Sequence, residues 1–200
     1  MLAGVSHDLR TPLTRMKLQI SLMKDEKAKS ELEVDVNEMT SMLDSYVSFV
    51  KTESPEPIET IIINELIGDI VKTVEKNGVE LTIKEKNTIQ TSGRQIQLKR
   101  AFNNIIDNSK RYAKQIEIIL YTNEKDCVIE FNDDGEGIPR DKYEDVFKPF
   151  FTLDPSRNKL KGESGLGLTI TRDIIRSHGG DVKLSDSNLG GLQLKVLLPL

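Results

Sequence analysis

Two apolar stripes, each with an alternating four- and three-residue spacing, occupy the first 50 residues of this 200-residue chain. A stripe of this kind lies along one side of an α-helix and packs against another helix, as in coiled coils and helical bundles. The polar stretch 24–27 between the stripes predicts a turn, so that the two helices form a hairpin. The stripes are Leu9, Leu13, Met16, Ile20 and Met23, and then Leu32, Val36, Met39, Leu43, Tyr46 and Val50.

A lone hairpin buries too little apolar surface to be stable by itself. Two hairpins from two copies of the chain would close a four-helix bundle, which predicts a homodimer. His7 lies two residues from both Val5 and Leu9 on the first helix. Two residues correspond to about 200° around a helix, so His7 is predicted to point away from the apolar stripe and into solvent.

The pattern changes after 53–57, where two prolines break the helix and predict a linker. We therefore divide the chain into a helical domain 1–53, a linker 54–57 and a second domain 58–200. Apolar spacing in the second domain predicts a mixed α+β layer, with helices on one face of a largely antiparallel sheet. Strands are predicted at 58–63, 79–83, 116–121, 128–132, 182–184 and 192–198. One helix is predicted after Asn64, which can cap it, a second at 95–112, and a third at 165–177, which ends before Gly179-Gly180.

Composition excludes several classes of function. The net charge is −4 and the pI about 5.4, and no basic stripe is present, which argues against a nucleic-acid binder. No run of 18 apolar residues is present to span a membrane. The chain begins inside a predicted helix, so we expect a fragment whose upstream part is missing. Its single cysteine, Cys127, lies in an apolar run and is predicted to be buried.

His7 and Asp8 form the first candidate site. A neutral imidazole is a competent nucleophile near neutral pH, and a neighbouring carboxylate can accept its proton. A histidine beside a charge usually has no function, so this pair is weak evidence alone. Thr11 lies one helical turn further on the same face, which places its hydroxyl near this chemistry. A threonine at that position could equally be only tolerated.

Two further groups of residues suit a nucleotide. Asn104 and Asn108 are four residues apart on one helix face, and amide oxygens are ligands suited to Mg²⁺. The segment 133–137 combines two acids with two glycines, which permit the close approach of a ligand. An acid buried at the strand end there could accept a hydrogen bond from an amino group such as that of adenine. Each pattern is uninformative singly, because polar helix faces and Asp-Gly turns are common.

The segment 162–168, Gly-Glu-Ser-Gly-Leu-Gly-Leu, opens a predicted helix. Backbone N–H groups at a helix N-terminus, left accessible by glycine, bind phosphate. The segment is neither a Walker loop nor a dinucleotide fingerprint, because the lysine and the strand-glycine-helix spacing are missing. The polar stretch 153–163 before it is predicted to be a mobile lid over a nucleotide.

In this order, the motifs resemble those of sensor histidine kinases over essentially the whole chain, with a likeness to EnvZ-type osmosensor kinases. The likeness implies a dimeric phosphotransfer hairpin, followed by a Bergerat-type, Hsp90-like α/β sandwich that binds ATP. It also implies the cytoplasmic portion of a bacterial inner-membrane protein. The matching segments are the phospho-acceptor box at 7–13, the N box at 103–112, the G1 box at 133–137, the F box at 147–151 and the G2 box at 162–168.

The resemblance also implies roles. His7 would be phosphorylated from ATP with Asp8 as general base, and would pass the phosphoryl group to an aspartate of an OmpR-like response regulator. Thr11 would help to hydrolyse the phosphorylated regulator. Asn108 would hold Mg²⁺, and Asp134, directly before Gly135, would read adenine. The other residues expected around the nucleotide are Asn104, Lys110, Arg111, Tyr112, Gly135, Gly137, Ile138, Phe150, Arg157, Ser164, Gly165, Leu166, Gly167 and Leu168.

Two alternative functions remain open. A degenerate kinase that serves as a dimeric scaffold would share the fold, and nucleotide binding tests it. An Hsp90-like ATPase would need no exposed nucleophilic histidine, and a stable label on His7 tests that.

Arg157 could reach phosphate or remain a solvated loop arginine. Ser109 stands where many relatives have a small alanine, and we expect this difference to matter little.

Overall fold

The computed structural model describes residues 2–50, 56–74, 79–153 and 165–200, and describes only the backbone of residues 2–10, 38, 41, 42, 44–50 and 74. Contacts divide the chain into two compact units. One contains Pro55–Phe147 and Gly167–Leu200, and forms an α/β domain. The other contains Met1–Ser54 and Lys148–Leu166, and its N-terminal part is a helical hairpin.

The hairpin consists of α1 (Leu2–Ser21) and α2 (Glu26–Val50), as predicted. Asp25 ends the turn between them, because its Oδ1 accepts hydrogen bonds from the N–H groups of Lys27 and Ala28, both at 3.1 Å. Such an acceptor satisfies amide groups that have no partner within the first helical turn. α1 continues through Pro12. The side chains buried between the helices are Leu13, Ile20 and Val36, with Met23 and Leu43 packed against them.

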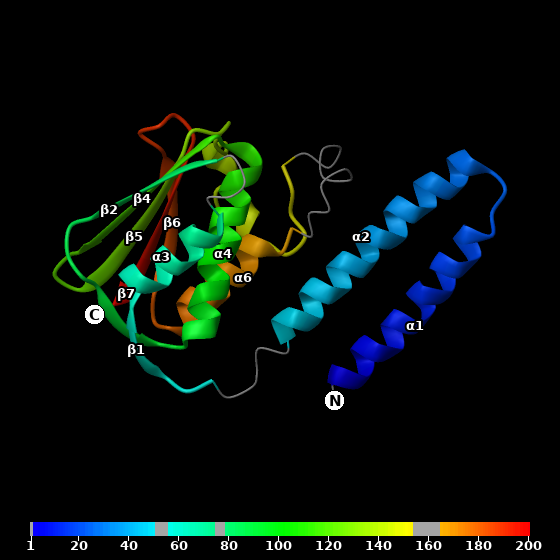
Figure 1. Ribbon diagram of the computed structural model, residues 1–200, viewed down its shortest axis with the longest axis horizontal. Coiled ribbons are helices and arrows are strands. Elements are labelled where there is room, and N and C mark those ends of the chain that lie inside the picture. Colours follow the sequence, from blue (N-terminus) through cyan, green and yellow to red (C-terminus); the bar gives the residue numbers. More distant parts are fainter. Residues whose placement is uncertain (1, 51–55, 75–78, 154–164) are drawn as a thin grey trace. The chain divides into compact units, whose positions relative to one another are not determined.

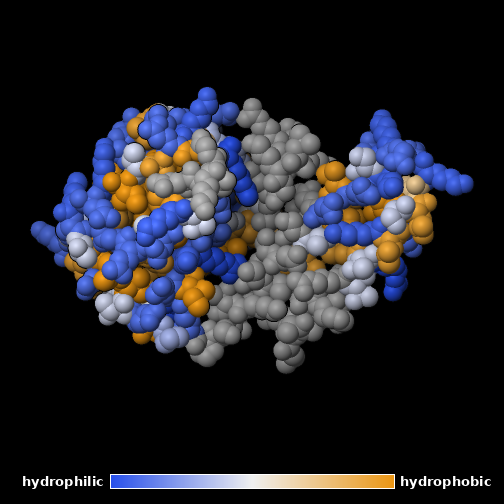
Figure 2. All heavy atoms as spheres, in the orientation of Figure 1, coloured by the Kyte–Doolittle hydropathy of each residue, from blue (hydrophilic) through white to orange (hydrophobic). Residues whose placement is uncertain are grey.

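Three residues of the predicted apolar stripes whose side chains the structure describes stay uncovered in a single copy. Met16, Leu32 and Met39 expose 44%, 41% and 50% of their surface, and apolar side chains are visible on the hairpin surface in Figure 2. An exposed apolar stripe beside a small core is what a second hairpin would cover. Within the described residues, no helix is long and apolar enough to cross a membrane.

The α/β domain is built on a five-stranded sheet in the order β2-β4-β5-β7-β6. β2 and β4 are parallel, and the other neighbours are antiparallel. Helices cover one face of this sheet (Figure 1), which confirms the predicted mixed layer. The strands are β2 (Glu80–Glu85), β4 (Gln115–Thr122), β5 (Asp126–Asp133), β6 (Asp181–Asp186) and β7 (Leu192–Pro199), and the helices are α3 (Ile63–Val74), α4 (Gln95–Tyr112) and α6 (Gly167–Ser177).

The domain core lies between α4, α6 and the covered face of the sheet. Phe102 of α4 and Phe131 of β5 are fully buried, with ring centroids 6.0 Å apart. Alternate residues of each strand point to the helices, as the period of two requires. Cys127 on β5 is buried as predicted, and burial raises the pKa of its thiol to about 11.

Two local expectations were wrong or incomplete. β1 (Glu59–Ile62) was expected, but its antiparallel partner β3 (Gln90–Gly93) was not. Asn64 lies inside α3 instead of before it. Its side chain accepts from the N–H of Ile89 at 2.8 Å and donates to the carbonyl of Asn87 at 3.3 Å. The residue therefore holds the β2–β3 connection rather than the helix end.

Candidate functional site

The C-terminal half of α4 lies beside the beginning of α6. The Asn104 amide donates to the carbonyl of Gly167 at 3.2 Å, and the Thr171 hydroxyl lies 3.3 Å from the carbonyl of Ala101. Asn108, one turn along α4, is half-buried, and its side chain makes no hydrogen bond among the residues that the structure describes. An uncommitted amide oxygen on this face fits a ligand of Mg²⁺.

The acid buried at the end of β5 is Asp133. Its Oδ1 accepts from the N–H groups of Leu192 at 2.9 Å and Gly135 at 3.1 Å, and its Oδ2 accepts from the Ser109 hydroxyl at 3.1 Å. A carboxylate offers about four acceptor positions, so these three donors leave one on Oδ2. A buried acceptor with one free position fits the exocyclic amino group of adenine.

The assignment of the buried acid to Asp134 was therefore wrong. Asp134 lies one residue beyond the strand, and its Oδ1 accepts from the N–H groups of Lys114 and Gln115, both at 2.8 Å. These backbone hydrogen bonds hold the pKa of Asp134 below its ordinary value. Alternation of polarity along the strand could have shown the difference, because Asp133 lies two residues after the apolar Phe131, whereas Asp134 lies two residues after the polar Asn132.

Glycines bring other segments close to Asp133. The N–H of Gly191 donates to the carbonyl of Asp133 at 3.0 Å, and a Cβ on Gly191 would collide with Oδ1 of Asp133 and the nitrogen of Gly135. Gly137 has φ +70°, a conformation that L side chains rarely adopt. Gly191 was not among the predicted site residues, because its role depends on a strand 58 residues away in sequence.

Ser109 is a second site residue that the sequence argument undervalued. It is buried on α4, and its hydroxyl supplies one of the three donors to Asp133. The difference from alanine at this position was expected to matter little, but the hydroxyl orients the carboxylate that faces the site.

Replacing Ser109 with alanine is expected to weaken ATP binding by roughly 5- to 10-fold, because its hydroxyl orients the acceptor without contacting ATP, and a typical intramolecular hydrogen bond contributes about 1 kcal/mol. Isothermal titration with ATP measures the change. Ser185→Ala is the matched control, since its hydroxyl donates to Gln193 at 2.7 Å on an exposed strand. An unchanged affinity in Ser109→Ala would contradict the role of this hydroxyl.

The arrangement of the phosphate motif is only partly described. Gly165 has φ +61°, and its carbonyl accepts from the N–H of Phe150 at 3.0 Å. Gly167 and Leu168 form the first turn of α6, directly after Leu166. The predicted lid 153–163 lies outside the described residues except for its first residue, and Arg157 and Ser164 lie outside them too. Their predicted contacts with phosphate stay predictions.

The other predicted contacts of the base lie around the end of α4 and beyond β5. Lys110 is partly buried, with its ammonium 3.5 Å from the Asp107 carboxylate, and Arg111 and Tyr112 are exposed on the last turn. Ile138 is half-buried directly after Gly137. Their contact with a nucleotide stays a prediction.

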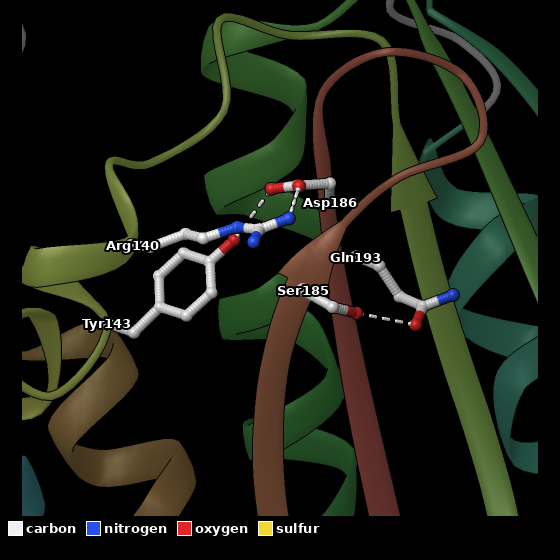
Figure 3. Close-up of polar contacts among 5 residues, drawn as sticks. All are labelled: Arg140, Tyr143, Ser185, Asp186 and Gln193. Carbon is white, nitrogen blue, oxygen red and sulfur yellow. Dashed lines mark hydrogen bonds and ion pairs between the residues drawn. The ribbon is translucent and has the colours of Figure 1, made fainter.

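Side chains of the segment after Gly137 contact the carboxylate of Asp186 on β6 (Figure 3). Arg140 forms an ion pair with Asp186 at 2.5 Å, and the Tyr143 hydroxyl donates to the same carboxylate at 2.9 Å. The hydrogen bond from Arg140, reinforced by that from Tyr143, lowers the pKa of Asp186. Both ends of the ion pair are exposed, so its effect is to place this segment rather than to stabilise the domain strongly.

The phospho-acceptor candidates lie in the hairpin. His7 and Asp8 belong to α1, but their side chains lie outside the described residues. Thr11 is exposed on the next turn of α1. The functional assignment of these three residues therefore depends on the sequence.

Two family profiles match the chain. Residues 93–200 match the histidine kinase-, DNA gyrase B- and HSP90-like ATPase family, and residues 1–54 match the His Kinase A phospho-acceptor domain. The first match covers more than half of the chain. The chain therefore belongs to this ATPase family and carries the phospho-acceptor domain of the histidine kinases in front of it: it is a histidine kinase core.

Relatives agree with this assignment. The chain is 31% identical to the sensor histidine kinase GtrS of Pseudomonas aeruginosa and 32% identical to CpxA of Escherichia coli K12. All of the chain aligns in both cases, but it spans only 41% and 46% of those proteins. The mycobacterial sensor kinase MprB has the same fold over 72% of this chain and 97% of its own, with a TM-score of 0.63 and 24% identity. Full-length ShkA matches 100% of this chain and 46% of its own, with a TM-score of 0.70 and 16% identity.

Proposed function

We propose that this chain is the catalytic core of a sensor histidine kinase that phosphorylates His7 with ATP and transfers the phosphoryl group to a response regulator. The observation that carries the proposal is the buried Asp133 with one free acceptor position, in a domain that matches an ATPase family. The phospho-acceptor domain in front of it contains His7. An ATPase without phosphotransfer does not account for that domain.

In this proposal, Asp133 would accept a hydrogen bond from the amino group of adenine, and Asn108 would hold Mg²⁺ through its amide oxygen. A cation held there would neutralise charge on the phosphates. The glycines at 165 and 167 leave backbone N–H groups of the α6 N-terminus accessible to phosphate oxygens. Phe150, next to Gly165, and Asn104, next to Gly167, would place these segments.

The reaction makes one bond and breaks one bond. A ring nitrogen of His7 attacks the γ-phosphorus in line, and the bond to the bridging oxygen breaks, so that ADP leaves. Asp8 accepts the proton that the imidazole loses. Positioning and electrostatic stabilisation supply most of the acceleration in such transfers.

The partners follow from the same proposal. The uncovered stripe of Met16, Leu32 and Met39 would pack against a second hairpin in a homodimer. The aspartate acceptor would belong to a receiver domain of the OmpR-like class, and the likeness to EnvZ-type kinases is part of this proposal. The chain would be the cytoplasmic portion of a longer bacterial inner-membrane protein, with its helical domain at 1–53, linker at 54–57 and ATP-binding domain at 58–200.

Incubation of the chain with Mg²⁺ and γ-labelled ATP tests the proposal. We expect a label on the protein that is lost in acid and kept in base, as for a phosphohistidine. Bound ATP without any label would favour the scaffold interpretation. Absence of both label and binding would reject the proposed function.

We also propose that Thr11 supports hydrolysis of the phosphorylated regulator. Thr11→Ala is expected to slow that hydrolysis by about tenfold or more, because its hydroxyl would place the attacking water. Loss of phosphate from a purified phosphorylated receiver domain measures it. Thr14→Ala, an exposed threonine one turn further, is the control. Hydrolysis that continues unchanged in Thr11→Ala, with autophosphorylation intact, would remove Thr11 from the mechanism.

A further inference from the structure

The N-terminus of α4 is capped by a side chain 40 residues earlier in the chain. Arg94 occupies the N-cap position, with extended φ and ψ and no side-chain cap hydrogen bond. A guanidinium group carries donors only, so it cannot accept the free N–H groups of a first helical turn. Glu56 does so instead: its Oε1 accepts from Ile96 at 2.5 Å, and its Oε2 accepts from Gln97 at 3.3 Å.

These two N–H groups are the ones that an N-cap side chain normally accepts. The negative charge of Glu56 is also favourable at the positive end of the helix. A second residue holds the same turn, because Nε2 of His178 accepts from the N–H of Arg94 at 3.0 Å. Burial lowers the pKa of His178, which keeps the ring neutral and Nε2 able to accept.

Glu56 belongs to the segment that joins the hairpin to the α/β domain. α2 ends at Val50 and β1 begins at Glu59, so the contact falls in the C-terminal half of the eight-residue connection. The helix that it caps is the one that carries Asn104, Asn108 and Ser109. The connection between the domains is therefore fastened to the helix that lines the candidate nucleotide site.

We propose that Glu56 is a latch that fastens the interdomain connection to α4, so that residue 56 and those after it move with the α/β domain. With the latch in place, five residues (51–55) separate α2 from the fastened point. With the latch released, eight residues (51–58) separate α2 from β1. Three extra residues add roughly 10 Å of reach, at about 3.3–3.6 Å per residue.

Distances between spin labels test the latch directly. One label is placed at Leu22→Cys, on an exposed residue of the hairpin turn, and the other at Lys183→Cys on exposed β6. The native Cys127 is buried and stays unlabelled. Labelled chain is diluted with excess unlabelled chain, so that each dimer carries one labelled copy. Glu56→Ala is expected to broaden the distance distribution, whereas the exposed Glu59→Ala, its matched control, leaves it as in the wild type.

A second variant separates the latch from an ordinary helix cap. Arg94→Asp places an acceptor at the N-cap of α4 itself, where it can satisfy Ile96 and Gln97 without involving the connection. In Glu56→Ala, amide exchange at these two residues is expected to rise on the order of fivefold. In the double variant, Glu56→Ala with Arg94→Asp, amide exchange at these two residues and the melting temperature are expected to return to their wild-type values. The distribution of distances between the spin labels is expected to stay broad.

Two results would overturn the latch: an unchanged distance distribution in Glu56→Ala, or a distribution that narrows again when Arg94→Asp restores the cap.

The effect on phosphoryl transfer rests on the proposed function. Lengthening the free connection from five to eight residues lowers the effective concentration of one domain near the other by about twofold. Autophosphorylation in the double variant is expected to fall by that factor at unchanged ATP affinity. A wild-type chain that takes up no label would reject the kinase, and the distances would still decide the latch.

Discussion

Replacing His7 with glutamine is expected to reduce the acid-labile label from ATP to background. Glutamine keeps the polarity and the approximate size of histidine, but its amide nitrogen is not a nucleophile because its lone pair is delocalised into the carbonyl. ATP binding is expected to stay within about twofold of the wild type, since the hairpin is separate from the domain that holds Asp133. Label counting after gel separation, beside titration with ATP, measures both quantities.

The chain offers a matched control, because it contains only two histidines. Both ring nitrogens of His178 are engaged, Nδ1 with the carbonyl of Ile174 at 2.7 Å and Nε2 with the N–H of Arg94. His178→Gln is therefore expected to keep the label. A label that persists in His7→Gln and disappears in His178→Gln would place the acceptor in the ATP-binding domain and contradict the proposed mechanism.

Long periodic segments were predictable because their structure depends on near neighbours. The range of α4, 95–112, follows from apolar residues that recur on one helix face, and the same is true of the two hairpin helices. The antiparallel layout of the sheet follows from short alternating strands with short connections. β3 gave no such signal, because its sequence Gln-Thr-Ser-Gly is polar and carries little strand preference.

Residues whose role depends on distant partners were harder to predict. The three donors to Asp133 come from α4, from the turn after β5 and from the beginning of β7, so no single motif shows that this acid is the buried one. Glu56 looked like part of a proline-rich linker, and only the fold brings it to Ile96. For the acid, the motif indicated the kind of chemistry and the tertiary contacts selected the residue, whereas the role of Glu56 follows from the tertiary contacts alone.

Replacing each of the two neighbouring acids in turn gives the sharpest test of which one contacts adenine. Asp133→Asn is expected to weaken ATP binding by roughly 30- to 150-fold, because a hydrogen bond to a charged acceptor worth about 2–3 kcal/mol is lost. The asparagine amide also turns a donor toward the amino group of adenine, which is itself a donor. Titration of the Mg²⁺–ATP complex measures the affinity, and the melting temperature shows whether the domain stays folded.

Asp134→Asn is the matched control for charge and shape. Its remaining carbonyl oxygen can still accept from Lys114 and Gln115, so ATP affinity is expected to change by no more than about twofold. The reverse result, a large loss in Asp134→Asn with little change in Asp133→Asn, would return the adenine contact to the residue directly before Gly135. Because the two acids are adjacent and carry the same charge, a difference between the two variants reports orientation and burial rather than the net charge of the site.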